Sequence, residues 1–140
     1  MLPIKVIDLR WSASGDLVIG KDGDLGDTKS SISLSFIQEI KTRIKSSTYD
    51  WATQPHIGAS LPDLLGRLNN RETAEDGKAR IMNSLTQDSF LDPGSVQVNY
   101  APISPTTILF TLTISTPFRD IGMLTFNTLV DIEESSVVFV

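Results

Sequence analysis

The sequence predicts an α+β fold with an N-terminal β-hairpin, about three helices and a C-terminal antiparallel sheet of about three strands. Two observations predict the helices: apolar side chains recur with helical spacing over residues 33–46 and again over about 72–86. A third predicts the sheet, because apolar and polar residues alternate from Ile108 to Ser115. Helices followed by a run of strands are typical of an α+β domain. We expect one domain spanning residues 1–140.

The hairpin is expected over residues 4–20. Strand-forming residues from Ile4 to Trp11 precede the turn signal Ser14-Gly15-Asp16, and Leu17-Val18-Ile19 forms the return. The segment that follows, residues 21–31, is rich in Asp and Gly and is predicted to be an exposed connection.

The first helix is predicted over residues 33–46, with its apolar stripe on one face. Ser35 and Gln38 have the spacing of a capping box. Glu39 and Arg43 are spaced for an ion pair on the outer face. This helix is expected to end near Ser46-Ser47.

The stretch from Thr48 to Asn70 separates the two main helical patterns. Pro55 and Gly58 predict irregular backbone, because proline restricts the residue before it and glycine adopts angles that others avoid. Ser60 is expected to cap a short helix with Pro62 in its first turn. The apolar stripe of that helix would comprise Leu61, Leu64, Leu65 and Leu68.

A further helix is predicted from about Glu72 to Thr86. Thr73 with Asp76 fits a helix start, and Asp76 with Arg80 is spaced for an ion pair. Gly77 counts against this helix, because glycine in a helix interior is about 1 kcal/mol less favourable than alanine.

The C-terminal part is predicted to be β-structure. Asp92-Pro93-Gly94 is a turn signal, residues 102–107 are a connection between two strands, and residues 123–131 form a third strand. The apolar tail Val137-Val138-Phe139-Val140 is either an added strand or a patch that pairs with a partner.

Composition excludes several classes of function. The chain has no cysteine, which rules out disulfides, thiol catalysis and cysteine-ligated metals. Its net charge of -5 and scattered basic residues argue against nucleic-acid binding. No apolar run approaches the roughly 18 residues that span a membrane, and the N-terminus lacks a signal-peptide pattern.

The candidate metal and catalytic residues have plainer interpretations. Asp22, Asp24 and Asp27 resemble a calcium loop, but the twelfth position of such a loop would be Ser33, so turn residues fit better. His56 is the single histidine, and no Gly-x-Ser-x-Gly elbow accompanies it. We expect a packing or hydrogen-bonding role for His56, and we predict no catalytic residue, cofactor or metal.

A pair of carboxylates could in principle hydrolyse a glycosidic bond. The acids of the helical segments all fall on polar faces, which is typical of solvated surfaces. They are Glu39, Glu72, Glu75 and Asp76.

Several short motifs resemble the small baseplate wedge subunit of contractile phage tails, a family also found in type VI secretion baseplates. The resemblance rests on Pro55-x-x-Gly58-x-x-Leu61 followed by Asp63-Leu64-Leu65-Gly66, with Tyr49-Asp50-Trp51 before it. Gly15-Asp16-Leu17 and Gly23-Asp24-Leu25 are similar to the family's N-terminal hairpin. The family's Glu/Asp-Pro-Arg turn is matched by Asp92-Pro93-Gly94 except at the arginine. The order of elements agrees across nearly the whole chain.

The resemblance implies a structural, non-enzymatic role in a virion. Such subunits lie in the tail baseplate near the tube, are assembled in the host cytoplasm, bind other wedge proteins and help seat the first ring of sheath subunits. Their contact with the sheath resembles the exchange of a strand between sheets. Tail tube or hub proteins are further expected partners, and the Leu-Leu-Gly-Arg-Leu-Asn run favours a phage over a secretion machine.

The interface residues that we predict are aromatic, apolar or turn-forming. They are Trp51, Pro55, Gly58, Leu61, Leu64, Leu65, Asp92, Pro93, Val137, Val138 and Phe139. Two alternatives stay open: a small peptidoglycan-acting, lysozyme-like hydrolase, and a soluble adaptor unrelated to tails.

Overall fold

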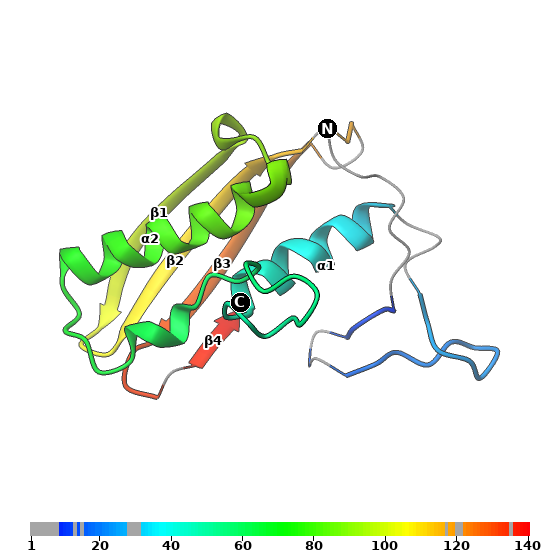
Figure 1. The fold of residues 1–140 in the computed structure, drawn as a ribbon, viewed down its shortest axis with the longest axis horizontal. Helices are drawn as coiled ribbons and strands as arrows, with labels where there is room; N and C mark the ends of the chain where they lie inside the picture. Colours follow the sequence, from blue (N-terminus) through cyan, green and yellow to red (C-terminus); the bar gives the residue numbers. More distant parts are fainter. Residues whose placement is uncertain are drawn as a thin grey trace. The chain divides into compact units, whose positions relative to one another are not determined.

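The computed structural model describes residues 9–12, 14, 16–27, 32–116, 118–119, 122–134 and 136–140. The chain divides into two compact units, Met1–Lys41 and Thr42–Val140 (Figure 1). Helix α1, Ile32–Lys45, begins in the first unit and ends in the second. Among the described residues, no helix is both long and apolar enough to cross a membrane.

The first unit contains bridges rather than strands in its described residues. Isolated antiparallel bridges join Leu9 to Asp27, Trp11 to Leu17 and Ile19 to Leu25. The side chain of Gln38 on α1 binds the backbone of Leu9 and Trp11 in this unit. Its Nε2 donates to the Leu9 carbonyl at 2.7 Å, and its Oε1 accepts from the Trp11 N–H at 3.0 Å.

The second unit is built on a four-stranded antiparallel sheet in the order β1-β2-β3-β4 (Figure 1). Its strands are β1 (Val96–Ser104), β2 (Thr107–Ser115), β3 (Met123–Asp131) and β4 (Ser136–Phe139). The apolar tail is therefore a strand that pairs with β3, as one of the two alternatives for it predicted. The predicted connection over residues 102–107 is shorter than expected, because β1 and β2 extend into it and leave only a tight turn.

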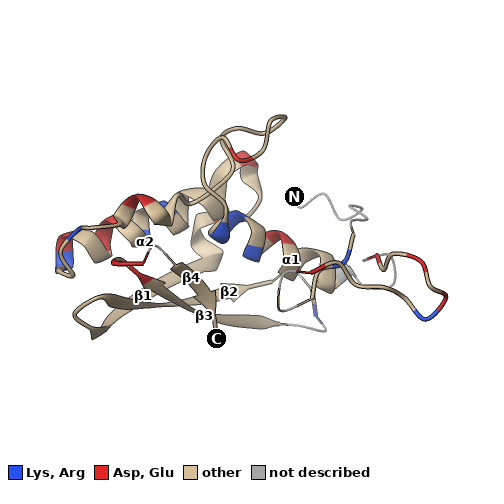
Figure 2. Ribbon diagram, turned by 90° about the horizontal axis from the view of Figure 1, so that it is seen from below, with Lys and Arg blue, Asp and Glu red and all other residues tan. Residues whose placement is uncertain are grey.

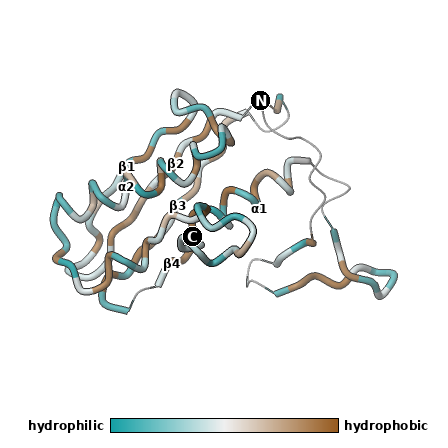
Figure 3. The backbone as a smooth tube through the Cα atoms, viewed as in Figure 1, coloured by the Kyte–Doolittle hydropathy of each residue, from teal (hydrophilic) through white to brown (hydrophobic). Residues whose placement is uncertain are grey.

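One face of the sheet packs on helix α2, Arg71–Thr86. The alternation in β2 assigns Ile108, Phe110, Leu112 and Ile114 to this face, and all four are fully buried. Hydrophobic stretches run along the strands of the sheet (Figure 3). Gly77 lies directly over the Phe110 ring, where a Cβ would come within 2.6 Å of the ring's Cζ. The alternating residues on the other face of the sheet are half-buried or exposed. The core therefore lies between α2 and one side of the sheet.

Helix α2 begins at Arg71, one residue before the predicted start at about Glu72, and ends at Thr86 as predicted. Its N-cap is Asn70, whose side chain accepts from the Thr73 N–H at 3.0 Å. Thr73 is buried within the first turn, so Asn70 caps the helix and the expected start signal of Thr73 with Asp76 does not. Asn70 satisfies one of the N–H groups that the first turn leaves without a partner in the helix.

The predicted set of a hairpin, about three helices and about three strands is wrong. The structure is mixed α+β with two α-helices, α1 and α2, and a sheet of four strands in its described residues. The expected middle helix is a single 3₁₀ turn, η1, at Leu61–Leu64. The expected hairpin is reduced to bridges in its described residues, and its predicted start at residues 4–8 lies outside them.

Candidate functional site

The segment from Ser47 to Pro55 is a closed loop, which we call the aromatic loop. The Asp50 carboxylate accepts from the Ser47 N–H at 2.9 Å, and the Asp50 N–H donates to the Ser47 carbonyl at 3.1 Å. The Tyr49 N–H donates to the Pro55 carbonyl at 2.7 Å and so joins the two ends of the loop. The hydrogen bonds hold the loop in one conformation without any apolar core of its own.

The aromatic loop displays two aromatic side chains to solvent. Tyr49 is 83% exposed and Trp51 is 45% exposed. The Trp51 indole is oriented by its Nε1, which donates to the Ser46 hydroxyl at 3.1 Å. Pro55 is also exposed. Aromatic side chains held in one orientation lose little conformational freedom when a partner covers them, which is typical of interface anchors.

Gly58 follows the loop where two stretches of backbone touch. A Cβ at this position would lie 2.5 Å from the Ser47 carbonyl carbon and 2.7 Å from the Ser46 oxygen, and φ is +131°. The Ala59 N–H donates to the Arg43 carbonyl at 3.1 Å, and the Ser60 N–H donates to the Ser46 carbonyl at 3.2 Å. Gly58 therefore lets the chain fold back against the end of α1.

The turn η1 divides the predicted leucine stripe into two groups. Leu61 and Leu64 are fully buried, whereas Leu65 is 52% exposed and Leu68 is 77% exposed. The predicted cap by Ser60 is wrong, because Ser60 has a left-handed backbone and its side chain makes no cap bond. Its hydroxyl instead accepts from the Thr48 N–H at 2.9 Å.

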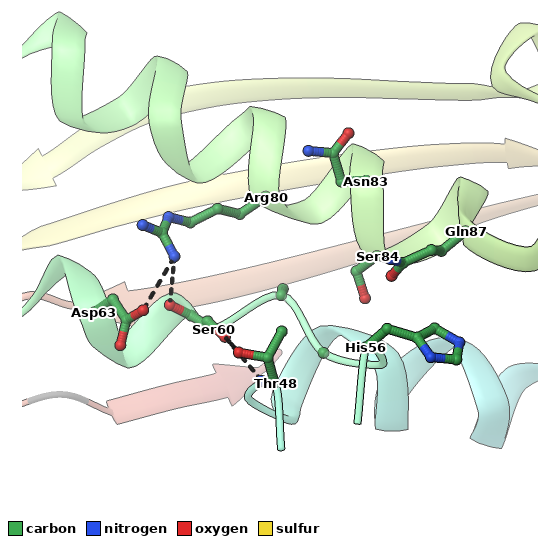
Figure 4. A pocket seen from close by; sticks show the side chains of 10 residues that line it. Thr48, His56, Ser60, Asp63, Arg80, Asn83, Ser84 and Gln87 are labelled. Atoms are coloured by element: carbon green, nitrogen blue, oxygen red, sulfur yellow. Dashed lines mark hydrogen bonds and ion pairs between the residues drawn. The ribbon is translucent and has the colours of Figure 1, made fainter. Parts of the chain in front are cut away.

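A pocket of about 280 Å³ lies between this segment and α2 (Figure 4). Arg80 from α2 borders it and donates to the Ser60 carbonyl at 3.2 Å and to Asp63 at 3.3 Å. His56 lies at the other end, where its Nε2 is 2.5 Å from Asp88 Oδ2. Polar side chains dominate the lining, which comprises Thr48, His56, Gly58, Ala59, Ser60, Asp63, Arg80, Asn83, Ser84 and Gln87.

The contacts of the pocket residues are those of a structural network. His56 is a hydrogen-bonding residue, as expected, and its partner Asp88 has a φ of +56°. The Ser84 hydroxyl donates to the Arg43 carbonyl at 2.6 Å, so it is already engaged in linking α2 to the end of α1.

Arg43 occupies a position that the sequence did not predict. It is 6% exposed, so its expected place on the outer face of α1 is wrong. Its guanidinium donates to the Ser84 carbonyl at 3.2 Å and lies 4.3 Å from the centre of the Phe90 ring. A buried guanidinium needs such partners because its charge and its five donors are costly to remove from water.

The acids of α2 also have partners. Asp76 accepts from Arg80 Nε at 3.3 Å and from Arg67, and Glu75 accepts from the Tyr100 hydroxyl at 2.7 Å. Partial burial acts to raise the pKa of Asp76, but the hydrogen bonds and charges of the two arginines outweigh it and hold that pKa below its ordinary value. The bond to Glu75 raises the pKa of Tyr100. A proton donor in glycoside hydrolysis needs the opposite shift of its carboxyl pKa.

Replacing Asp76 by asparagine is expected to lower the free energy of unfolding by about 1 kcal/mol near neutral pH, since the half-exposed network is partly screened by water. A depressed pKa gives stability that is present above the unfolded pKa of about 4 and lost as pH falls through the lower folded value. Urea unfolding at several pH values should therefore show the difference between wild type and variant shrinking below about pH 4. A constant difference would contradict this assignment.

The remaining predicted interface residues lie in the C-terminal half. The exposed Asp92 caps the turn before β1, because its Oδ1 accepts from the Gly94 N–H at 3.3 Å, and Pro93 beside it is exposed. In β4, Val137 is buried, Val138 is 49% exposed and Phe139 is half-buried. Trp51, Pro55, Gly58, Leu61, Leu64 and Leu65 belong to the segment between α1 and α2, whereas Asp92, Pro93 and the β4 residues follow α2 in the chain.

Within the described residues, no three His, Cys, Asp or Glu side chains are grouped so that they could hold a metal ion. Asp22 and Asp24 are turn residues, as expected, because Asp22 Oδ1 accepts from the Asp24 N–H at 3.2 Å.

No protein-family model, no curated protein and no solved structure matches this chain.

Proposed function

We propose that this chain is a structural subunit of a contractile tail baseplate, without a catalytic step of its own. In this proposal it is assembled in the host cytoplasm into the virion, close to the tail tube and hub. It binds neighbouring wedge proteins and helps to seat the first sheath ring. The motifs between Tyr49 and Gly66 and the order of elements motivate the proposal. The observation that carries it is the edge of the sheet formed by β4.

The main chain of β4 has one side directed away from β3. The Val140 N–H donates to the Asn127 carbonyl at 2.9 Å, so these two residues form a hydrogen-bonded pair. Such pairs alternate along an antiparallel ladder, and Val138 with Leu129 is therefore the next one. The N–H of Val137, beside that pair, points outward. An edge with an outward N–H accepts an added strand from a sheath subunit.

The aromatic loop supports the second half of the proposal, the contact with wedge proteins. Tyr49 and Trp51 are exposed on a hydrogen-bonded frame, and a partner surface would remove them from water. Buried aromatic anchors of this kind typically contribute about 2 kcal/mol or more each to binding.

One residue differs from the pattern of the baseplate wedge family, and this difference limits which of that family's contacts we propose for this chain. Gly94 stands where the family has arginine after the Asp-Pro pair. Asp92 and Pro93 form an exposed capped turn without that cation. We therefore assign no arginine-dependent contact to this turn.

Pull-down from producing cells, with quantitative mass spectrometry of wedge and sheath proteins, tests the proposal with two variants. Val137→Pro removes the outward N–H without removing a bond to β3, and we expect it to lose the sheath protein and keep the wedge proteins. Tyr49→Asn tolerates the loop's positive φ, and we expect it to recover wedge proteins at least tenfold less well.

Matched controls separate these effects from unfolding. Val137→Ala keeps the N–H and should retain the sheath protein, and Leu68→Asn removes an exposed leucine outside the loop and should change neither partner. Recovery of no tail protein by the folded wild type would overturn the proposal. Muralytic activity of the purified protein would favour the hydrolase instead, and the genes that neighbour its own would identify an unrelated adaptor.

A further inference from the structure

The side of the sheet that α2 does not cover carries an apolar row across all four strands. The register aligns Ala101 with Leu109, Leu109 with Leu129, and Leu129 with Val138. Ala101 is exposed, Val138 is 49% exposed, and the two leucines between them are half-buried. We call these four residues the open-face row.

Most of the residues beside the open-face row on the same face are polar, although the exposed Val140, directly after β4, extends the neighbouring row. In the neighbouring row, Asn99, Thr111 and Asn127 are partners, and the Thr111 hydroxyl donates to Asn127 Oδ1 at 3.1 Å. Thr113 and Thr125 follow one row further along. Among the described residues of this face, the open-face row is therefore the one apolar row that crosses all four strands, and Val140 and Met123 are single exposed apolar residues outside it.

The spacing of the row fits a helix better than a strand. Neighbouring strands lie about 4.8 Å apart, so the row repeats at that distance and extends over about 14 Å. The apolar stripe of a helix repeats every three to four residues, which is about 5 Å, and about 10 helical residues span the row. If a strand lay along the row instead, the side chains on its one face would be about 7 Å apart and would not match the spacing of the row, which is about 4.8 Å.

The charges beside the row are of one sign. None of the four strands contains lysine or arginine (Figure 2). Asp131 follows Leu129 on the same face, and the exposed Glu133 and Glu134 come after the buried Ile132 in the turn that begins there. The Asp131 carboxylate accepts from the N–H groups of both glutamates at 2.8 and 2.9 Å, which holds the three acids in one turn.

We infer that the open-face row is a docking surface for a basic amphipathic helix of another protein. The leucines receive the apolar stripe of that helix, and the acidic turn attracts its lysines or arginines. A second copy of this chain fits less well, because it would bring the same acids and a net charge of -5 to the contact. Four side chains also provide much less than the roughly 800 Å² per partner of a stable dimer. This inference does not rest on the tail proposal.

Two synthetic 14-residue peptides test the inference by fluorescence anisotropy with the full-length chain. Both carry the same leucine stripe; one has lysines on its other positions and the other has glutamates. We expect the lysine peptide to bind at least tenfold more tightly. Leu109→Thr with Leu129→Thr should weaken it at least tenfold, because threonine suits a strand but lacks the apolar surface. Thr113→Ser, on the same face outside the row, should leave binding unchanged.

A second variant is independent of the stability of the sheet. Glu133→Lys with Glu134→Lys changes only exposed side chains, and it should weaken the lysine peptide and strengthen the glutamate peptide. Failure of the wild type to bind the lysine peptide, or equal binding of both peptides, would overturn the inference. Sedimentation that shows a dimer abolished by Leu129→Thr would also overturn it and assign the row to a second copy.

Discussion

Replacement of Gly58 by alanine is expected to lower the free energy of unfolding by about 3 kcal/mol, because it combines a strained backbone angle with a clash against main chain. The φ of +131° disfavours any side chain, and the new Cβ would lie within 2.8 Å of three backbone atoms of Ser46 and Ser47. Backbone cannot rotate away as a side chain can, so the loop or the end of α1 has to move. Chemical denaturation of the two proteins measures the loss.

Gly66 is the matched control for this prediction. Its φ is also positive, at +77°, but nothing lies within 4 Å of a Cβ built there. Gly66→Ala should therefore lower the free energy of unfolding by only about 1 kcal/mol, the cost of a left-handed backbone for a residue with a Cβ. Equal losses at both positions would show that the close approach of Gly58 to the end of α1 contributes nothing to stability, and would contradict its role in folding the chain back at this point.

Gly77→Val is expected to lose about 3 kcal/mol, because a side chain at this position would overpack the contact between α2 and the sheet. The nearest atoms to a Cβ would include Phe110 Cζ at 2.6 Å and Leu64 Cδ1 at 3.3 Å, and both residues are fully buried. Helix propensity alone predicts the opposite sign, since valine is a better helix former than glycine. Thermal and urea unfolding give the sign directly.

Ala79→Val is the control on the same helix. Ala79 is exposed two residues further along α2, so the substitution should cost no more than about 0.7 kcal/mol of helix propensity. A stabilising Gly77→Val would mean that Gly77 is tolerated in α2 rather than required by Phe110.

Helix α2 and the C-terminal strands could be predicted because their apolar periodicity extends over many residues. In β2, four alternating apolar residues pack on α2, and the pattern that signals a strand is the one that fills the core. The tail was ambiguous because four apolar residues suit either a strand or an unpaired apolar end. The register of β4 on β3 depends on the turn after Asp131, which only the structure provides.

The segment from Ser60 to Leu68 could not be predicted because its leucine pattern covers too few turns to distinguish a helix from a turn. Leu65 has a non-helical ψ of 130° and Gly66 a positive φ, so the helix does not propagate beyond Leu64. Leu65 and Leu68 then face solvent instead of extending the stripe. Local propensity was overridden at this segment by contacts with the end of α1 and with α2.

The sequence predicted irregular backbone around Pro55 and Gly58, but it did not show why glycine is required at position 58. That reason lies in the backbone of Ser46 and Ser47, which no spacing rule can place beside Gly58. The prediction of Arg43 on the outer face failed for a similar reason. Glu39, four residues earlier, suggested a surface ion pair, whereas the carbonyl of Ser84 and the ring of Phe90 hold Arg43 in the interior. Contacts between segments decide both positions.

The most direct test of the proposed role is amide hydrogen exchange at Val137, measured in the free protein and in its complex with the tail sheath protein. In the free protein the N–H points away from β3, so we expect fast exchange, in contrast to the paired N–H of Val138. Strand addition should protect Val137 at least a hundredfold in the complex and leave Val138 little changed. A complex in which Val137 exchanges as fast as in the free protein would contradict sheath binding at this edge.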